Sequence, residues 1–369
     1  MTYFAEFTSN TYAGSGNQFW FSLPEGQVQT GRVFYKITAP GKYRYSLLFS
    51  NIMDSTYASG DQSCKNMLCH SWKIHSAKVG KGRILGGRKV TEMIMGEDVL
   101  AEEWQTITFD GRADKTVAPG ELFASDPVEL AFAEGEYLCL EMTYSGKMIP
   151  YHEETLLPVF VKEAEGWKYG KQMPFAGMVG CDRPVKAKIA YWGDSITQGI
   201  GTAANSYLHW NAELSRKIGN DYAFWNLGIG YGRGNDAASN GAWAFKAKQN
   251  DVVFVCYGVN DILQGLPEAQ VKADLTHIVA MLKQAGKKVV LQTVPPFGYE
   301  GEQLEIWHRV NGYIRTVLKE QVDLLFDNVS ILGDETTSVT RFGGHPNEEG
   351  CKLWADALWE AVSVSQLLD

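Results

Sequence analysis

The sequence lacks an excess of basic residues. Its 369 residues include 34 Lys and Arg against 43 Asp and Glu, which gives a formal net charge of −9. Proteins that bind polyanions through charge alone usually present a basic face. We therefore expect no nucleic acid partner.

The sequence also lacks a long apolar run. No stretch approaches the roughly 20 apolar residues that cross a bilayer, and the first ten residues, MTYFAEFTSN, have neither the basic nor the apolar segment of a secretory signal. We expect no membrane partner and a cytoplasmic location. Coiled-coil heptads and internal repeats are not visible either, so the oligomeric state stays open.

Cysteine is scarce, and its six positions are scattered along the chain. Cys64 and Cys69 have no Cys or His pair at zinc spacing nearby, and Cys139 and Cys256 lie in apolar runs where a thiol packs as a small hydrophobe. The pattern favours reduced thiols over disulfides or a metal site.

What is present falls into two halves, as expected for a chain longer than the usual limit for one domain. From Phe19 to about Lys162, short β-rich runs with period two alternate with Pro-Gly, Gly-Lys and Asp-Gly turns. This pattern favours an antiparallel sandwich or jelly roll. We predict a first domain at residues 1–184, ending at Pro184, and a second at residues 185–369.

In the second half, short apolar runs alternate with segments of helical spacing. The expected strands are Lys188–Trp192, Asp221–Leu227, Asp251–Tyr257, Lys288–Val294 and Val322–Phe326. The expected helices are Asn205–Ile218, Ala237–Lys248, Pro267–Ala285, Glu302–Lys319 and Pro346–Val362. This alternation predicts an α/β domain with a parallel sheet. Ligands bind such sheets at the carboxyl ends of the strands, so the loops there are the place to look for chemistry.

Three loops at these strand ends carry candidate groups. GDSITQGIG (Gly193–Gly201) places Ser195 on a strand-to-helix turn, as a nucleophile or as an ordinary helix cap. NLGIGYGRGND (Asn226–Asp236) has glycines that let backbone N–H groups approach a ligand, and it lacks a full dinucleotide motif. In YGVNDI, the Asn260 amide is a donor for an oxyanion or part of an Asx turn.

A fourth candidate, His345, lies in RFGGHPNEEG after the fifth expected strand. A lone histidine is more often structural than catalytic. Here, however, a nucleophile, an amide donor and a base all fall on one edge of the same sheet. That combination favours a catalytic histidine, presented by two glycines and by Pro346 in the first turn of the last helix.

These four blocks resemble, in order, the signature blocks of the SGNH hydrolases, the GDSL esterase and lipase superfamily. The likeness covers roughly Lys186 to the C-terminus. It implies a three-layer α/β/α, flavodoxin-like domain with a five-stranded parallel sheet, in which no cofactor or metal is needed. By resemblance, Ser195 is the nucleophile and His345 the general base. The oxyanion hole would use the Asn260 side chain and N–H groups of Ser195 and of the second loop.

Two positions depart from the family pattern. Tyr231, beside Gly230, stands where a glycine is usual, which leaves open which of the two amides serves the oxyanion hole. Phe342 stands where an aspartate usually precedes the histidine by three residues. The orienter of His345 is then a backbone carbonyl, as two-domain carbohydrate esterases of similar architecture use, or a carboxylate of Asp334 or Glu335.

The first half is similar, at the level of pattern only, to the β-sandwich that precedes the SGNH domain in some bacterial two-domain esterases and acyltransferases. The whole chain therefore predicts a serine esterase acting on a small, acetyl-type ester, with a carbohydrate ester as the expected substrate. An acyltransferase using the same residues and a non-catalytic carbohydrate-binding protein on this scaffold are the alternatives. Trp192, Trp210, Trp243 and Trp307 suit sugar stacking and core packing equally well.

Overall fold

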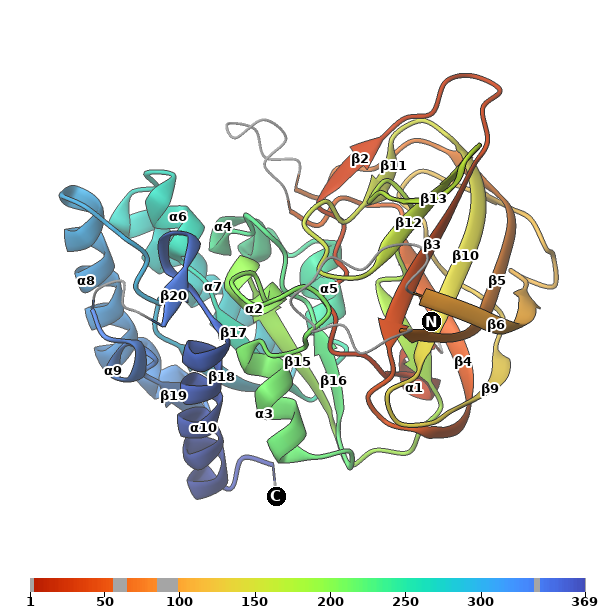
Figure 1. The fold of residues 1–369 in the computed structure, drawn as a ribbon. Helices are drawn as coiled ribbons and strands as arrows, with labels where there is room; N and C mark the ends of the chain where they lie inside the picture. The colour runs from red at the N-terminus through yellow and green to blue at the C-terminus, as the bar shows by residue number, and fades with distance from the viewer. Residues whose placement is uncertain (1–2, 56–64, 85–98, 335–338, 369) are drawn as a thin grey trace. The chain divides into compact units, whose positions relative to one another are not determined.

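The computed structural model describes residues 3–55, 65–84, 99–334 and 339–368 (Figure 1). The chain divides into two units, Met1–Pro184 with Ala204–Ser206, and Val185–Ala203 with Tyr207–Asp369. Each unit is described by itself below.

The first unit is built from antiparallel strands, so the prediction of an all-β first half is confirmed. One sheet has the strand order β13-β12-β3-β10-β5-β6, with β7 added beside β5; a second has the order β1-β14-β4-β8, with β9 beside β4; and β11 pairs with β2. The bounds are β1 Thr8–Ser9, β2 Phe19–Phe21, β3 Gln29–Lys36, β4 Gly41–Ser50, β5 Trp72–Ile84, β6 Val99–Ile107, β7 Lys115–Val117, β8 Leu122–Ala124, β9 Val128–Phe132, β10 Tyr137–Gly146, β11 Ile149–Tyr151, β12 Val159–Glu163, β13 Gly166–Tyr169 and β14 Met178–Cys181, after a short helix α1 at Tyr3–Glu6.

Alternation along the central strand β10 explains why this sequence forms a sheet. Leu138, Leu140 and Met142 are completely buried and share one face of the strand because side chains alternate with period two. On the other face, Glu141 lies opposite Arg32 of β3 and forms an ion pair with it. The face with Leu138, Leu140 and Met142 packs into the core of this unit. On the other face, the Glu141–Arg32 pair lies beside a second buried cluster that includes Cys139 and Phe34.

The second unit contains a five-stranded sheet in the order β16-β15-β17-β18-β19, with all four pairings parallel. It is drawn in green to blue in Figure 1. Its strands are β15 Lys188–Gly193, β16 Ala223–Asn226, β17 Val252–Cys256, β18 Lys288–Gln292 and β19 Leu324–Phe326, and β20 Thr340–Arg341 pairs separately with β21 His345–Pro346. Its helices are α2 Ser195–Gln198, α3 Trp210–Ile218, α4 Gly234–Ala238, α5 Ala242–Ala247, α6 Val259–Leu263, α7 Glu268–Gln284, α8 Glu302–Thr316, α9 Val329–Leu332 and α10 Glu348–Ser365, with 3₁₀ turns at Leu318–Gln321 and Phe342–Gly344. The prediction of an α/β second half is confirmed.

The strand order places the functional loops. The chain runs from β15 outward to β16 and then crosses back to β17, so the direction of winding reverses at β15. Right-handed crossovers then put α3 on one face of the sheet and α4, α7 and α8 on the other. On the first face α3 packs on α10, and on the second α7 packs on α4 and α8. Every residue of β17 is buried, as expected for a strand covered on both faces. The loops after β15 and β17 emerge at this switch point, where ligands bind in such folds.

Three expected helices differ from the observed ones. The helix expected at Asn205–Ile218 begins at Trp210, because Asn205 and Tyr207 have positive φ angles of 60° and 54° that an α-helix excludes. The helix expected at Ala237–Lys248 is split into α4 and α5, since Asn240 has a φ of 57°.

The last helix also begins later than expected. Pro346 lies in the short strand β21 rather than in the first helical turn. Asn347 caps α10, and its side chain accepts a hydrogen bond from the Gly350 N–H.

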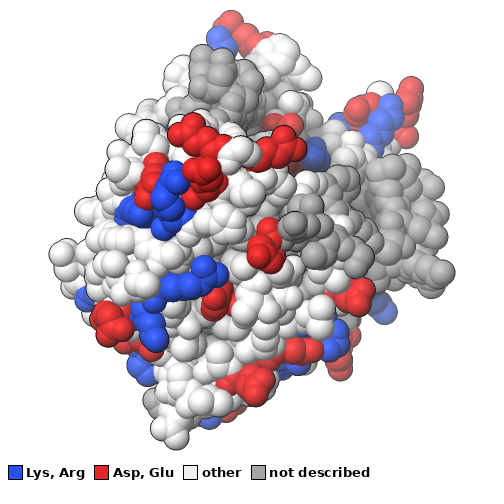
Figure 2. Space-filling view, turned by 90° about the vertical axis from the view of Figure 1, so that its left-hand side faces the viewer, with Lys and Arg blue, Asp and Glu red and all other residues white. Residues whose placement is uncertain are grey.

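Within the part of the chain that the structure describes, no helix combines the length and apolar character needed to span a membrane. Figure 2 shows basic and acidic side chains interspersed on one face of the molecule. In the second unit, neighbouring side chains of opposite charge form ion pairs, for example Arg309 of α8 with Glu268 of α7 and with Glu305.

Candidate active site

Ser195 and His345 meet at the carboxyl end of the parallel sheet. Ser195 is the first residue of α2, directly after β15, and His345 lies in β21. The Ser195 Oγ and the His345 Nε2 are 2.8 Å apart, which is hydrogen-bond distance. The structure therefore brings together the two residues that the sequence singled out as nucleophile and base, although they are far apart along the chain.

The turn that carries Ser195 is tightly defined. Asp194 caps α2, and its carboxylate accepts a hydrogen bond from the Ile196 N–H at 3.0 Å. The helix ends after four residues at Gly199, whose φ of 118° suits glycine. Ser195 therefore serves as the first helical residue and not as the cap, and Asp194 takes the capping role that the sequence left open.

Two glycines allow neighbouring loops to approach this turn closely. A Cβ atom at Gly201 would lie 2.3 Å from the Pro346 carbonyl oxygen and 2.9 Å from the Cβ of His345. A Cβ atom at Gly228 would lie 2.2 Å from the backbone nitrogen of Gln198. Any larger residue would push the histidine strand or the second loop away from Ser195.

The second loop folds over the end of β15. The Gly228 N–H donates to the Asn226 side chain at 2.9 Å, and the Ile229 N–H donates to the Gly193 carbonyl at 3.2 Å. A turn closes between the Gly232 N–H and the Ile229 carbonyl at 3.0 Å. Gly230 and Tyr231, the two predicted amide donors, are the central residues of this turn.

Tyr231 has an unusual conformation for a tyrosine. Its φ angle is +59°, in the left-handed region that glycine favours, and its side chain is 49% exposed. When the third residue of a β-turn has a positive φ, it is normally glycine or asparagine. Tyr231 therefore adopts the backbone conformation that the glycine usual at this position would adopt without steric cost.

Asn260 contacts the same loop from α6. Its Nδ2 donates to the Gly232 carbonyl at 2.8 Å, and the side chain is buried. The primary amide has two N–H groups, and this bond uses one of them. The Asn260 side chain thus lies beside the second loop. A Cβ atom added at Gly232 would lie 3.6 Å from the Asp194 Cα, so the loop passes close to the turn that carries Ser195.

Further contacts fasten the second loop to α6, and the sequence did not reveal them. The Asp261 carboxylate accepts from the Gly234 N–H at 2.8 Å and the Asn235 N–H at 3.0 Å. Arg233 donates twice to Asp236, at 3.1 and 2.7 Å, and once to Gln264. The only signal was that Asp261 directly follows Asn260, because its partners Gly234 and Asn235 lie on the second loop, distant from it along the chain.

Burial changes the protonation of the carboxylates under this loop. Burial raises the pKa of Asp194 to about 7, and the nearby Asp261 charge adds to the effect while the Ile196 N–H opposes it. Burial likewise raises the pKa of Asp261 to about 6, opposed by the Asn235 and Gly234 N–H groups. Both carboxyls therefore hold their protons more tightly than an exposed aspartate does.

An aromatic ring packs on His345, for which the sequence left a backbone carbonyl, Asp334 or Glu335 open as orienter. The Phe297 ring packs edge-to-face on the imidazole, with centroids 4.8 Å apart and an interplanar angle of 81°. The Asp334 side chain is exposed. Glu335 lies outside the described residues. Among the described residues, no group of three or more His, Cys, Asp or Glu side chains could hold a metal ion.

Comparison with known protein families gives a match for most of the second unit. Residues 191–353 match the GDSL-like Lipase/Acylhydrolase family. The predicted resemblance to this family is thus confirmed for the residues that the family model covers. No curated protein matches the chain.

Several solved structures are similar to about half of the chain. One is a member of the lipolytic protein G-D-S-L family from Veillonella parvula DSM 2008, at 24% identity and a TM-score of 0.41, covering 48% of this chain and 98% of that one. Another is the acetyl xylan esterase AlAXEase, at 25% identity and a TM-score of 0.40, covering 47% and 99%. A third is a carbohydrate esterase family 3 protein from Talaromyces cellulolyticus, at 17% identity and a TM-score of 0.39, covering 49% and 97%.

Proposed function

We propose that the protein is a serine esterase that hydrolyses small, acetyl-type esters through an acyl-enzyme. The observation that supports this most strongly is the 2.8 Å contact between Ser195 Oγ and His345 Nε2 at the carboxyl end of the parallel sheet of a GDSL-type domain. A serine activated by a neighbouring base is the arrangement that acyl transfer requires.

The proposed mechanism assigns a role to each of these groups. Nε2 of neutral His345 takes the proton of Ser195 as Oγ attacks the ester carbonyl. The oxyanion that forms is met by the N–H of Ser195, by the second Asn260 N–H and by an amide of Gly230 or Tyr231. His345 then gives its proton to the leaving alcohol, and water attacks the acyl-enzyme by the same route.

For the orientation of His345, we propose a Ser-His dyad supported by a backbone carbonyl. The exposed position of Asp334 supports this choice over that carboxylate. Asp334→Ala and Glu335→Ala should each leave turnover close to wild type. A loss of about three to four orders of magnitude in either variant, as removal of a triad orienter can cause, would instead identify the carboxylate.

For the substrate, we propose an acetylated saccharide. Trp192, Trp210, Trp243 and Trp307 do not support this, because all four are buried in the core of the second unit. The aromatic support comes instead from Tyr231, which is half exposed on the second loop and suits contact with a sugar ring. A panel of acetylated saccharides and of esters with longer acyl chains tests the choice through kcat/KM.

The central test compares p-nitrophenyl acetate hydrolysis by wild type and Ser195→Ala. We expect turnover to fall by about four to six orders of magnitude, as in other enzymes that lose this nucleophile. Ser330→Ala removes an exposed serine of the same unit and should leave the rate unchanged. Equal rates for wild type and Ser195→Ala would favour a non-catalytic binding protein, and products that carry the acetyl group on an added alcohol would favour an acyltransferase.

A further inference from the structure

We propose that Phe297 is a positioning residue that holds the His345 imidazole in the plane needed to reach Ser195. This inference rests on the proposed function, in which His345 is the general base. It assigns to an aromatic ring part of the orienting role that a carboxylate has in a catalytic triad.

The first support is the direct contact between the two rings. Their centroids are 4.8 Å apart and their planes are nearly perpendicular, at 81°. Edge-to-face aromatic pairs are favourable at this distance. Rotation of the imidazole about its Cβ–Cγ bond would break this packing and also move Nε2 away from the Ser195 Oγ, 2.8 Å away. The ring contact and the hydrogen bond therefore favour the same rotamer.

The second support is the fit of the glycine turn before His345 against the same residue. A Cβ atom at Gly344 would lie 2.6 Å from the Phe297 Cα and 2.9 Å from the Pro296 carbonyl oxygen. Gly343 has a φ of +80°, and a Cβ atom there would lie 3.2 Å from the Phe297 ring. Phe297 thus contacts both the imidazole and the backbone that presents it.

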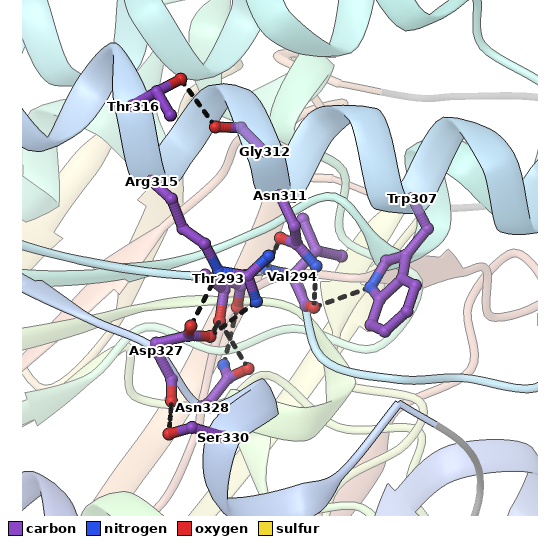
Figure 3. A network of polar contacts seen from close by, with 10 residues as sticks. All are labelled: Thr293, Val294, Trp307, Asn311, Gly312, Arg315, Thr316, Asp327, Asn328 and Ser330. Carbon is purple, nitrogen blue, oxygen red and sulfur yellow. Dashed lines mark hydrogen bonds and ion pairs between the residues drawn. The ribbon is translucent and has the colours of Figure 1, made fainter.

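The third support is that the Phe297 loop is itself held in place. Figure 3 shows Trp307 and Asn311 reaching from α8 to Val294, at the start of this loop. Asn311 accepts from the Val294 N–H at 2.8 Å and donates to its carbonyl at 3.0 Å, and the Trp307 indole donates to that carbonyl at 2.8 Å. After Phe297, the Tyr299 hydroxyl donates to the Pro295 carbonyl at 3.2 Å.

The consequence is a specific effect on the chemical step. Phe297 is apolar, so it fixes geometry without adding charge beside the imidazole. Loss of the ring should reduce the fraction of enzyme in which Nε2 faces Ser195, which lowers kcat. KM for a small ester should stay unchanged, because substrate binding does not depend on the imidazole plane. Since a misplacement of about 1 Å can cost about 100-fold in rate, we expect a decrease in kcat of about 10- to 100-fold.

The test compares Phe297→Leu with Phe297→Tyr and with a matched control, Phe224→Leu. Phe224 is buried in β16 of the same unit and packs on Tyr191. We expect Phe297→Leu to lower kcat for p-nitrophenyl acetate by about 10- to 100-fold at constant KM, and Phe297→Tyr, which keeps the ring, to restore most of the rate. Phe224→Leu should lower the Tm without this loss of kcat.

Three outcomes would overturn the inference: a wild-type kcat in Phe297→Leu, an equal loss in Phe224→Leu, or a higher KM at constant kcat. The proposed function fails separately, if Ser195→Ala is as active as wild type. In that case NMR of the His345 ring protons still decides on the positioning role. Phe297→Leu should remove the ring-current shift and give averaged imidazole orientations, and an unchanged spectrum would exclude the role.

Discussion

Tyr231 adopts a backbone conformation that is unfavourable for any residue other than glycine. Its φ of +59° costs on the order of 1 kcal/mol for a side chain of this kind. Such cost is tolerated where the position has a function, and Tyr231 lies in the turn that offers backbone donors to the proposed oxyanion. The strained residue Tyr231 therefore lies in the same turn as the backbone amides that we propose as oxyanion donors.

We predict that Tyr231→Gly raises the free energy of unfolding by about 0.5 to 1 kcal/mol, because glycine adopts positive φ without steric cost. Hydrolysis of p-nitrophenyl acetate should stay within about threefold of wild type, since a backbone donor does not need the side chain. Urea unfolding and steady-state kinetics measure the two effects. Asn240→Gly is the control, because Asn240 also has positive φ, at 57°, and is exposed. A large loss of kcat would show that the tyrosine side chain takes part directly.

Asp194 gives a prediction for pH dependence. Burial raises its pKa to about 7, so the folded state holds this proton more tightly than the unfolded state, whose carboxyl has a pKa of about 3.9. The contribution of this group to stability is therefore complete at low pH and is lost as the pH rises from about 4 to about 7. The ionised, buried carboxylate is the destabilised form.

Asp194→Asn removes this titration and keeps an oxygen that can accept from the Ile196 N–H. Relative to wild type, the variant should gain stability as the pH rises from 5 to 8, by about 1 to 4 kcal/mol. Urea unfolding at several pH values measures the difference. A pH-independent difference for Asp194→Asn would contradict the assignment.

At the scale of elements, helix α8 determines where the loop after β18 lies. Asn311 satisfies both the N–H and the carbonyl of Val294 and is 1% exposed. A second set of contacts joins α8 to the end of β19, where Arg315 donates twice to the Asp327 carboxylate, at 2.7 and 2.9 Å (Figure 3). Polar side chains of one helix thus hold the ends of two neighbouring strands.

We predict that Asn311→Ala lowers the free energy of unfolding by about 2 to 4 kcal/mol, because a buried N–H loses its acceptor and a cavity is left. It should also lower kcat, since the Phe297 loop loses an anchor. In a double-mutant cycle with Phe297→Leu, the two losses of kcat should not add, because both substitutions release the same imidazole. Additive losses would mean that Asn311 acts on catalysis by a route that does not include Phe297.

The sequence predicted the strands of the second unit well, for a physical reason. Runs such as VVFVC are buried on both faces and lie between turn residues, so their position depends little on distant contacts. Helix starts were predicted less well. The start at Trp210 depends on positive φ angles at Asn205 and Tyr207, which composition does not reveal.

The same distinction applies to the candidate site. Ser195, Asn260 and His345 could be selected because each follows a strand and matches a signature block. Phe297 could not, because PPFGYE reads as an ordinary loop and its role depends on a contact with another loop. The capping of the second loop by Asp261 is likewise a tertiary contact. Local patterns predicted the candidate reacting groups, whereas the residues that we propose to position them could be found only from the structure.

At the scale of the whole molecule, each unit has its own buried core. Leu140 of β10 is completely buried in the first unit, and Leu291 of β18 is completely buried in the second. We propose that the two units, with a boundary at Pro184, are separate domains that each unfold cooperatively, as expected for a chain of this length.

Leu140→Ala and Leu291→Ala test this proposal, because each leaves a cavity of the same kind in one unit and should cost about 2 to 5 kcal/mol. Scanning calorimetry should resolve two transitions, with Leu140→Ala lowering the Tm of one and Leu291→Ala the Tm of the other. The double variant should show both shifts without interaction, since distant substitutions add. Loss of p-nitrophenyl acetate hydrolysis on heating should follow the transition that Leu291→Ala shifts, because Ser195, Asn260 and His345 all belong to that unit. A single transition that both substitutions lower equally would mean that the two units fold as one domain.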